Sequence, residues 1–236
     1  HVSPHLVLAG VLGGGAAARG AAHPQRLAAQ AVLQHFYCLF NISTALQRLG
    51  SGARQPSGPS HCVGFSQKQA GAALTRHLLE RGRKRIAFAG AQLDPRVMQR
   101  LYGWRTALQE AGLYEPTLEF LNPAPSSLAL GGILFEQIMQ QRPAVDAIFF
   151  CNDDLAQGAL MAALRLGIAV PSQVAIAGFN DLTGSDQMLP ALTTVRTPRA
   201  QIGEAAAQML LSLMRGEEPA DPQLDLGFDI VQRQST

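Results

Sequence analysis

Polar side chains follow three strand-like runs of the sequence, at the point where each apolar run ends. They are Asp94 after "RIAFAGAQL", Asn152 and Asp153 after "AIFFC", and Asn180 and Asp181 after "VAIAGF". In an open parallel sheet, ligands bind beyond the carboxyl ends of the strands, where the strand order reverses. The repeated arrangement therefore predicts one binding site that several strand ends build together.

The chemistry of these side chains indicates which kind of ligand they would bind. Their carboxylate and amide groups can hydrogen-bond to hydroxyl groups. Arg100 adds a guanidinium within the helix expected after Asp94, and an arginine can hold a carboxylate by two parallel hydrogen bonds. The set is suited to a polyhydroxylated ligand, with Arg100 available to bind a carboxylate group on it.

Each of these residues also has a purely structural interpretation. Asn152 or Asp153 could cap the helix that follows, and Asp94 is expected to cap a helix whatever else it does. The Asn-Asp pair after "VAIAGF" could form an ordinary turn. Arg100 could share a solvated helix face with Arg96, one turn away.

Motifs of catalysis are missing from the sequence. It contains no G-x-S-x-G, H-E-x-x-H, P-loop or C-x-x-C motif. "GGGAAA" at 13–18 is a weak dinucleotide-binding fingerprint. Such a site needs an acidic residue about twenty positions later to bind the ribose, but the first acidic residue of this sequence is Glu80. Five of the 6 histidines lie within 1–61, and His77 falls in the middle of a helix. We therefore expect a binding protein rather than an enzyme, with no cofactor and no catalytic residue.

Composition narrows the class of protein further. Of the 236 residues, 47% are hydrophobic and 15% are charged, so a well-filled core is expected. The 3 scattered cysteines predict neither a disulfide framework nor a zinc site and fit a reducing cytoplasm. The sequence has no run of about 18 apolar residues, so no membrane-spanning helix is predicted. The net charge of +2 does not indicate a surface that binds polyanions.

From residue 61 onward, strand-like runs alternate with helical patterns. Strands are expected at 61–65, 84–90, 116–125, 146–150, 174–181 and 224–236, and helices at 67–82, 94–112, 127–143, 153–167 and 198–216. Continuous apolar strands between amphipathic helices predict a parallel sheet covered on both faces. The fold class is therefore doubly wound α/β.

The motifs in this region resemble a known family. "CNDDLAQGAL", "VPSQVAIAGFND", "LPALTTVRTP" followed by "IGEAAAQMLL", and "QRLYGW" resemble the effector-binding domain of the lactose/galactose repressor family. "VGFSQKQAG", "DPRVMQRLYGW" and "LDLGFDIVQRQST" are most similar to its gluconate-operon repressor branch. The resemblance covers residues 61–236 and rests on several motifs in a fixed order.

The resemblance implies a periplasmic-binding-protein-like fold, in which two Rossmann-like subdomains with parallel sheets are joined by three crossovers around an effector cleft. Residues 61–92 and 196–218 would belong to an incomplete N-terminal effector subdomain. Residues 93–195 and 219–236 would form the C-terminal effector subdomain.

The resemblance also assigns ligand-binding residues. Arg100 matches the family's ligand-binding arginine before a Gly-Trp pair, and Asn152 matches the Asn of its "ND" motif, with Asp153 beside it. Asn180 stands where many members have Asp after "GF" or "GY", so a negative charge is lost and an anionic sugar acid is favoured. Asp94 lies where the family places another cleft residue.

The function implied is that of the effector-binding and dimerisation domain of a bacterial transcriptional repressor, a cytoplasmic homodimer that responds to gluconate or a related sugar acid. Operator DNA would be read only through a helix-turn-helix domain that this chain lacks, and no membrane is involved. The alternative is a sugar-binding receptor of a transport system, which shares this architecture but needs an export signal.

Residues 1–60 do not match the family and are atypical in composition. They hold four arginines and no lysine or acidic residue, for a charge of +4, whereas the remaining fifteen basic and seventeen acidic residues give −2. "LVLAGVL" could be the core of a signal peptide, and an acid-free leader with arginines could be a targeting segment. Our hypothesis is that residues 1–60 come from a shifted reading frame in a GC-rich gene. Such a segment would be poorly ordered.

Overall fold

The computed structural model describes residues 61–236. The predictions made for residues 1–60, including the weak dinucleotide fingerprint and the shifted reading frame, lie outside the described residues. None of the helices within 61–236 has both the length and the apolar character needed to cross a membrane.

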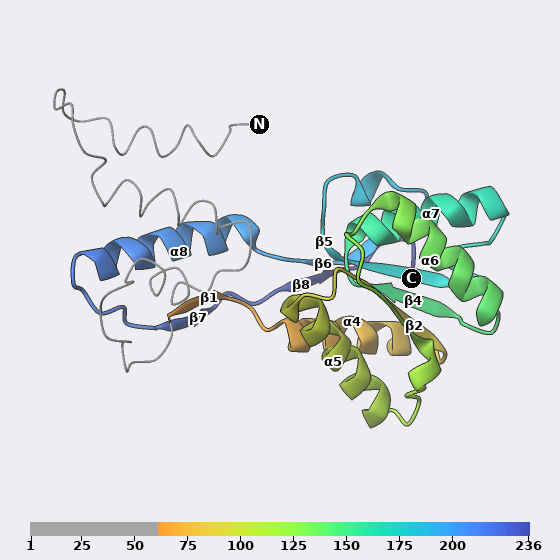
Figure 1. The fold of residues 1–236 in the computed structure, drawn as a ribbon, viewed down its shortest axis with the longest axis horizontal. Helices are drawn as coiled ribbons and strands as arrows, with labels where there is room; N and C mark the ends of the chain where they lie inside the picture. The colour runs from red at the N-terminus through yellow and green to blue at the C-terminus, as the bar shows by residue number, and fades with distance from the viewer. Residues whose placement is uncertain (1–60) are drawn as a thin grey trace. The chain divides into compact units, whose positions relative to one another are not determined.

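The described chain alternates helices with strands, as predicted (Figure 1). The helices are α4 (Gln67–Glu80), α5 (Pro95–Glu110), α6 (Leu128–Gln141), α7 (Asp153–Leu166) and α8 (Arg199–Met214). The strands are β1 (Cys62–Gly64), β2 (Ile86–Ala91), β3 (Glu119–Asn122), β4 (Ala147–Phe150), β5 (Ala175–Asn180), β6 (Thr193–Arg196), β7 (Gln223–Asp225) and β8 (Asp229–Val231). Short 3-10 helices, η1 (Pro116–Leu118) and η2 (Ser185–Gln187), precede β3 and β6.

A six-stranded sheet forms the centre of the described region. Its order is β3-β2-β4-β5-β6-β8, and every neighbouring pair is parallel except β6 and β8. The chain moves from β2 outward to β3 and then returns past β2 to β4, so the strand order reverses between β2 and β4. This reversal is where ligands bind in open parallel sheets.

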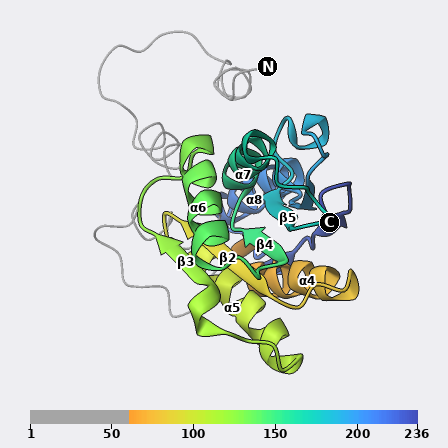
Figure 2. The same cartoon turned by 90° about the vertical axis from the view of Figure 1, so that its right-hand side faces the viewer.

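Helices cover both faces of this sheet (Figure 2). α4 and α5 pack against each other on one face, and α6 and α7 pair on the other. The predicted doubly wound α/β fold is therefore confirmed. Parallel strands covered in this way have no solvent-facing side, which explains why β2 and β4 are buried along their whole length.

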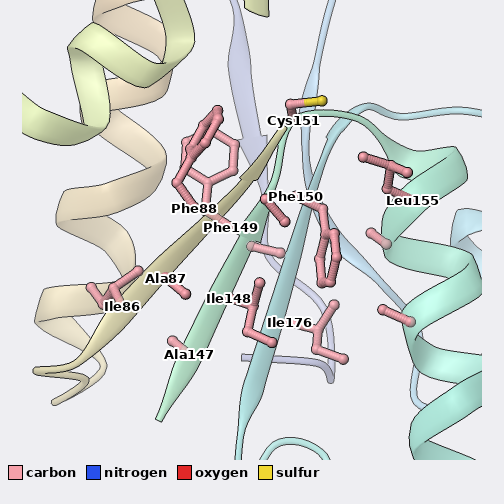
Figure 3. Packing of buried hydrophobic residues seen from close by; sticks show 14 of the residues in the cluster. Ile86, Ala87, Phe88, Ala147, Ile148, Phe149, Phe150, Cys151, Leu155 and Ile176 are labelled. Carbon is pink, nitrogen blue, oxygen red and sulfur yellow. The ribbon is translucent and has the colours of Figure 1, made fainter. Parts of the chain in front are cut away.

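Aromatic side chains fill the space between the sheet and α5. The ring centroids of Phe88 and Phe149, on neighbouring strands, lie 5.1 Å apart in an edge-on contact (Figure 3). Trp104 of α5 packs on Phe88 at 5.9 Å. Burying each such ring contributes about 1.5–3 kcal/mol relative to an exposed one. This packing holds β2 and β4, and therefore their carboxyl ends, in place.

A second, two-stranded sheet joins β1 to β7 in parallel, and α8 contacts β1.

The predicted single strand at 224–236 is wrong, because Gly227 turns the chain with a φ of 67° and β7 and β8 join different sheets. β6 was not predicted. The boundary placed after residue 92 also differs from the structure, because β2 pairs with β3 and β4 and α4 packs on α5.

Three chain segments connect the two sheets, as the family resemblance implied: one follows β1, one follows β6, and one follows β7. The first and third contact each other directly. The Leu226 amide donates to the Gly64 carbonyl at 2.8 Å, and the rings of Phe65 and Phe228 lie 6.1 Å apart. The first and third crossovers are therefore packed together rather than independent.

Two glycines bring α4 and α5 into close contact beside the site. A Cβ added to Gly103 would meet the backbone of Lys68 and Ala72, and one added to Gly71 would meet the backbone of Arg100. The position of Arg100 therefore depends on backbone-to-backbone packing that tolerates no side chain at these two positions.

We expect Gly103→Ala to lower the free energy of unfolding by about 1–3 kcal/mol, because the added methyl group forces the helices apart. Urea unfolding of the full chain measures this effect. Gly203→Ala on α8 is the control, since nothing lies within 4 Å of its added Cβ, and it should raise stability by about 0.5–1 kcal/mol. Equal stabilities for the two variants would contradict the close crossing.

Candidate functional site

The carboxyl ends of the parallel strands carry the polar residues that the sequence singled out. Since neighbouring strands point the same way, the segments that follow them meet along one edge of the sheet. The residues there include Asp94 after β2, Ser126 after β3, Asn152 after β4 and Asn180 at the end of β5.

Arg100 extends from α5 to the ends of two central strands. Its Nε donates to Gln67 Oε1 at 2.8 Å, and its Nη1 donates to the backbone oxygen of Cys151. Its guanidinium carbon lies 3.8 Å from the centroid of the Phe179 ring, a cation–π contact. Because Cys151 directly precedes Asn152 and Phe179 directly precedes Asn180, the backbone of both predicted residues lies near the guanidinium of Arg100.

The guanidinium of Arg100 is nearly enclosed yet has no carboxylate partner among residues 61–236. The residue is 5% exposed. Burial lowers its pKa to about 10, so it stays charged at neutral pH. The idea that Arg100 shares a solvated helix face with Arg96 is therefore wrong. Among the described contacts its Nη2 alone has no hydrogen bond, so a two-bond grip on a carboxylate would have to displace Gln67 or the Cys151 carbonyl.

Asn152 is the residue that caps α7. Its Oδ1 accepts from the Leu155 amide at 3.1 Å, and its Nδ2 donates to Ser126 Oγ at 2.7 Å. The capping interpretation is therefore confirmed for Asn152. Capping also fixes its side chain at the strand ends, where it remains partly exposed.

Asp153 differs from its neighbour because it is fully buried. Its Oδ2 accepts from the Leu182 amide at 2.6 Å and from Ser185 Oγ at 3.1 Å, and its Oδ1 accepts from Thr194 Oγ1 at 2.6 Å. Burial raises the pKa of this carboxyl despite those donors. The structure thus corrects the prediction of direct ligand contact: Asp153 ties α7 to β6 and to the loop after β5.

Asp94 is the cap of α5, as expected. Its Oδ1 accepts from the amides of Arg96 at 2.9 Å and Val97 at 3.1 Å, and its Oδ2 pairs with the Arg96 guanidinium at 2.8 Å. Burial acts to raise the pKa of Asp94, but hydrogen bonds from Arg96 and Val97 outweigh it and lower the pKa. Its role toward a ligand stays a prediction.

The turn after β5 holds two residues in the left-handed region of the backbone. Asn180 has a φ of 109° and Asp181 a φ of 50°, conformations that cost about 1–3 kcal/mol each. Asp181 accepts from Arg233 at 2.7 Å and from Arg196 at 2.8 Å. Burial tends to raise its pKa, but these two arginines lower it overall. The side chain of Asn180 has no hydrogen bond within 61–236, and its role toward a ligand stays a prediction.

A cavity of about 660 Å³ opens beside this turn. It is lined by Asn180, Asp181, residues 196–201 and residues 226–229. Neither Arg100 nor Asn152 lines this cavity. The predicted residues therefore lie along one edge of the sheet, but only Asn180 and Asp181 among them line the cavity.

Several residues at this edge were not identified from the sequence. Ser126 follows a strand as Asn152 does, so the same pattern could have found it. Gln67 and Phe179 carried no such signal, because their contacts with Arg100 exist only in the folded chain. Within the described residues no cluster of three or more His, Cys, Asp or Glu side chains is arranged to hold a metal ion.

Comparison with known proteins matches this region to a family. Residues 75–236 match the model of the periplasmic binding protein-like domain. The regulator "HTH-type transcriptional regulator GntR" of Pseudomonas aeruginosa is 57% identical over 176 residues, which are 75% of this chain and 51% of the relative. The chain thus spans about half the length of that relative.

Solved structures agree with this match. The transcription regulator GntR from Chromobacterium violaceum is 55% identical, with a TM-score of 0.73 over 74% of this chain and 65% of that one. A LacI family regulator from Silicibacter pomeroyi is 27% identical, with a TM-score of 0.70 over 76% of this chain and 54% of that one.

We expect Asp153→Ala to destabilise the protein by at least about 2 kcal/mol, because it leaves the donors on Leu182, Ser185 and Thr194 without their acceptor. Thermal or urea unfolding measures the loss. Asp154→Ala is the matched control: it lies in the same first turn of α7, and its carboxylate has no hydrogen bond to a described residue. A change within about 0.5 kcal/mol is expected there; similar losses for both would refute the anchoring role.

Proposed function

Because the chain belongs to the periplasmic binding protein-like domain family, we propose that residues 61–236 bind the effector of a bacterial transcriptional repressor that responds to gluconate or a related sugar acid. The resemblance of the chain to the lactose/galactose repressor family, in its GntR-like branch, is confirmed by the relatives above. The effector itself is inferred from the chemistry of the strand ends.

The observation that carries the proposal is the buried guanidinium of Arg100 at the ends of β4 and β5. A charge removed from water is costly unless a partner compensates it. Arg100 contacts a carbonyl, an amide oxygen and an aromatic ring, but no described carboxylate bonds to it. The negative charge of a ligand bound at these strand ends would offset the charge of the guanidinium. The free amide of Asn180 and the partly exposed amide of Asn152 would hydrogen-bond to its hydroxyl groups.

The crossovers provide the route from effector to DNA. An effector bound at the strand ends would favour one arrangement of the segments that follow β1, β6 and β7. Such a ligand shifts an equilibrium only by its difference in affinity for the two states. We place DNA binding in a helix-turn-helix domain, of the kind named in the Pseudomonas aeruginosa relative, outside residues 61–236, and we expect the protein to act in the cytoplasm.

Exposed apolar side chains support the proposed homodimer. Ile133 on α6, Leu164 on α7 and Leu189 after η2 are 60%, 72% and 78% exposed. Met161, one turn before Leu164, is also exposed. α6 and α7 pack on each other, and a contiguous patch of exposed apolar side chains marks an association surface. A dimer would bring two DNA-reading domains together.

We expect Arg100→Lys to weaken gluconate binding at least about tenfold, because lysine keeps the charge but loses the planar fork and the ring contact. Calorimetric titration of the full chain measures the affinity, and circular dichroism checks the fold. The control is Arg105→Lys on the same helix, whose guanidinium pairs with Glu119 instead. If the Arg100 variant bound gluconate with wild-type affinity, Arg100 would not be a ligand-binding residue.

We expect Leu164→Glu to shift the dimer towards monomer, because it introduces a charge into an apolar interface. Sedimentation at several protein concentrations measures the association constant. Leu113→Glu, at an exposed leucine after α5, is the control and should leave association unchanged. If the association constant of the Leu164→Glu variant were unchanged, the dimer interface would lie elsewhere.

A further inference from the structure

The amino end of α8 faces the cavity beside Asn180 without a cap. Its cap position is Pro198, which offers no side chain to accept a hydrogen bond. The amides of Ala200 and Gln201, in the first turn, have no acceptor among residues 61–236. All three residues line the cavity. Free amides and the positive end of a helix dipole make such a position favourable for an anion.

A buried hydroxyl provides an independent sign that the cavity receives a ligand. Thr197 lines the same cavity and is only 8% exposed, yet its Oγ1 has no hydrogen-bond partner within the described part of the chain. Buried polar groups are nearly always paired. An unpaired hydroxyl beside uncapped amides is therefore explained if a ligand oxygen completes the set.

The charges that line the cavity leave one cation available. Arg196 pairs with Asp181 at 2.8 Å. Arg199 reaches only the backbone oxygen of Asp181, at 3.3 Å, and forms no ion pair with a described carboxylate. Asp229 is the other acidic residue of the lining and is exposed. Arg199, the first residue of α8, can therefore turn its guanidinium to a bound anion.

We propose that this cavity is the subsite for the carboxylate of the effector. Thr197 Oγ1 and the amides of Ala200 and Gln201 donate to the carboxylate oxygens, and Arg199 supplies the opposite charge. Asn180, on the wall of the same cavity, meets a hydroxyl of the polyol chain. The inference rests on the proposed function and adds to it: the carboxylate binds at α8, and Arg100, with only Nη2 free, meets the remainder of the ligand.

The test is calorimetric titration of the full chain with gluconate. Arg199→Gln should weaken binding at least about tenfold, and Thr197→Val about three- to tenfold, because each removes a donor to a charged group. Arg215→Gln, at the other end of α8, and Thr106→Val, whose hydroxyl donates to its own helix, should bind like the wild type. Glucose, the neutral counterpart, should bind only weakly, and with the same affinity, to Arg199→Gln and to the wild type.

Backbone NMR separates failure of this subsite from failure of the proposed function. The Ala200 and Gln201 amide signals should shift on addition of gluconate. If the wild type binds gluconate while both variants bind as tightly, the subsite is wrong and the proposed function stands. If gluconate does not bind but inorganic phosphate shifts these amides, the anion subsite stands and the effector assignment fails. If neither ligand has any effect, both are overturned.

Discussion

The guanidinium of Arg100 lies between the ends of β4 and β5, and the account of this protein depends on that placement. It bonds to the carbonyl of Cys151 and covers the ring of Phe179. Each of these contacts is one residue before an amide side chain, Asn152 or Asn180. One buried cation therefore contacts both strand ends and gives the region a positive charge to which no described carboxylate bonds.

The surrounding structure holds this cation by packing and by hydrogen bonds rather than by ion pairs. Gly71 and Gly103 let α4 and α5 cross closely enough to place the backbone of Arg100. Asp153 performs a similar task on the other side, since its buried carboxylate anchors the loop after β5. The strained backbone of Asn180 persists because this loop is fixed at both ends. The site is thus organised before any ligand arrives.

The sequence predicted the sheet and the positions of the polar residues at the strand ends because both depend on local patterns. β2, β4 and β5 are continuous apolar runs, and the polar residue after each run marks the strand end. β6 was missed, because four residues with two threonines give little signal and are buried only through pairing with β5 and β8. The change of sheet at Gly227 depends on one glycine conformation.

The role of each polar residue was harder to predict from the sequence than its position at a strand end. Asn152 and Asp153 are adjacent and both polar, yet one caps α7 at the surface and the other is buried as an anchor. Sequence spacing cannot make that distinction, because the three donors around Asp153 come from distant parts of the chain. Thr197 and Arg199 gave no signal, since the cavity that they line forms only when the segments after β5, β6 and β7 meet.

The central claim is that these strand ends bind a polyol with a negative charge. The most direct test is the melting temperature of the full chain with matched pairs of neutral sugars and sugar acids, because a ligand that binds only the folded state raises it. We expect gluconate to raise the melting temperature in proportion to its concentration and glucose to leave it nearly unchanged. An equal rise with glucose, or no rise with any sugar acid, would contradict the account.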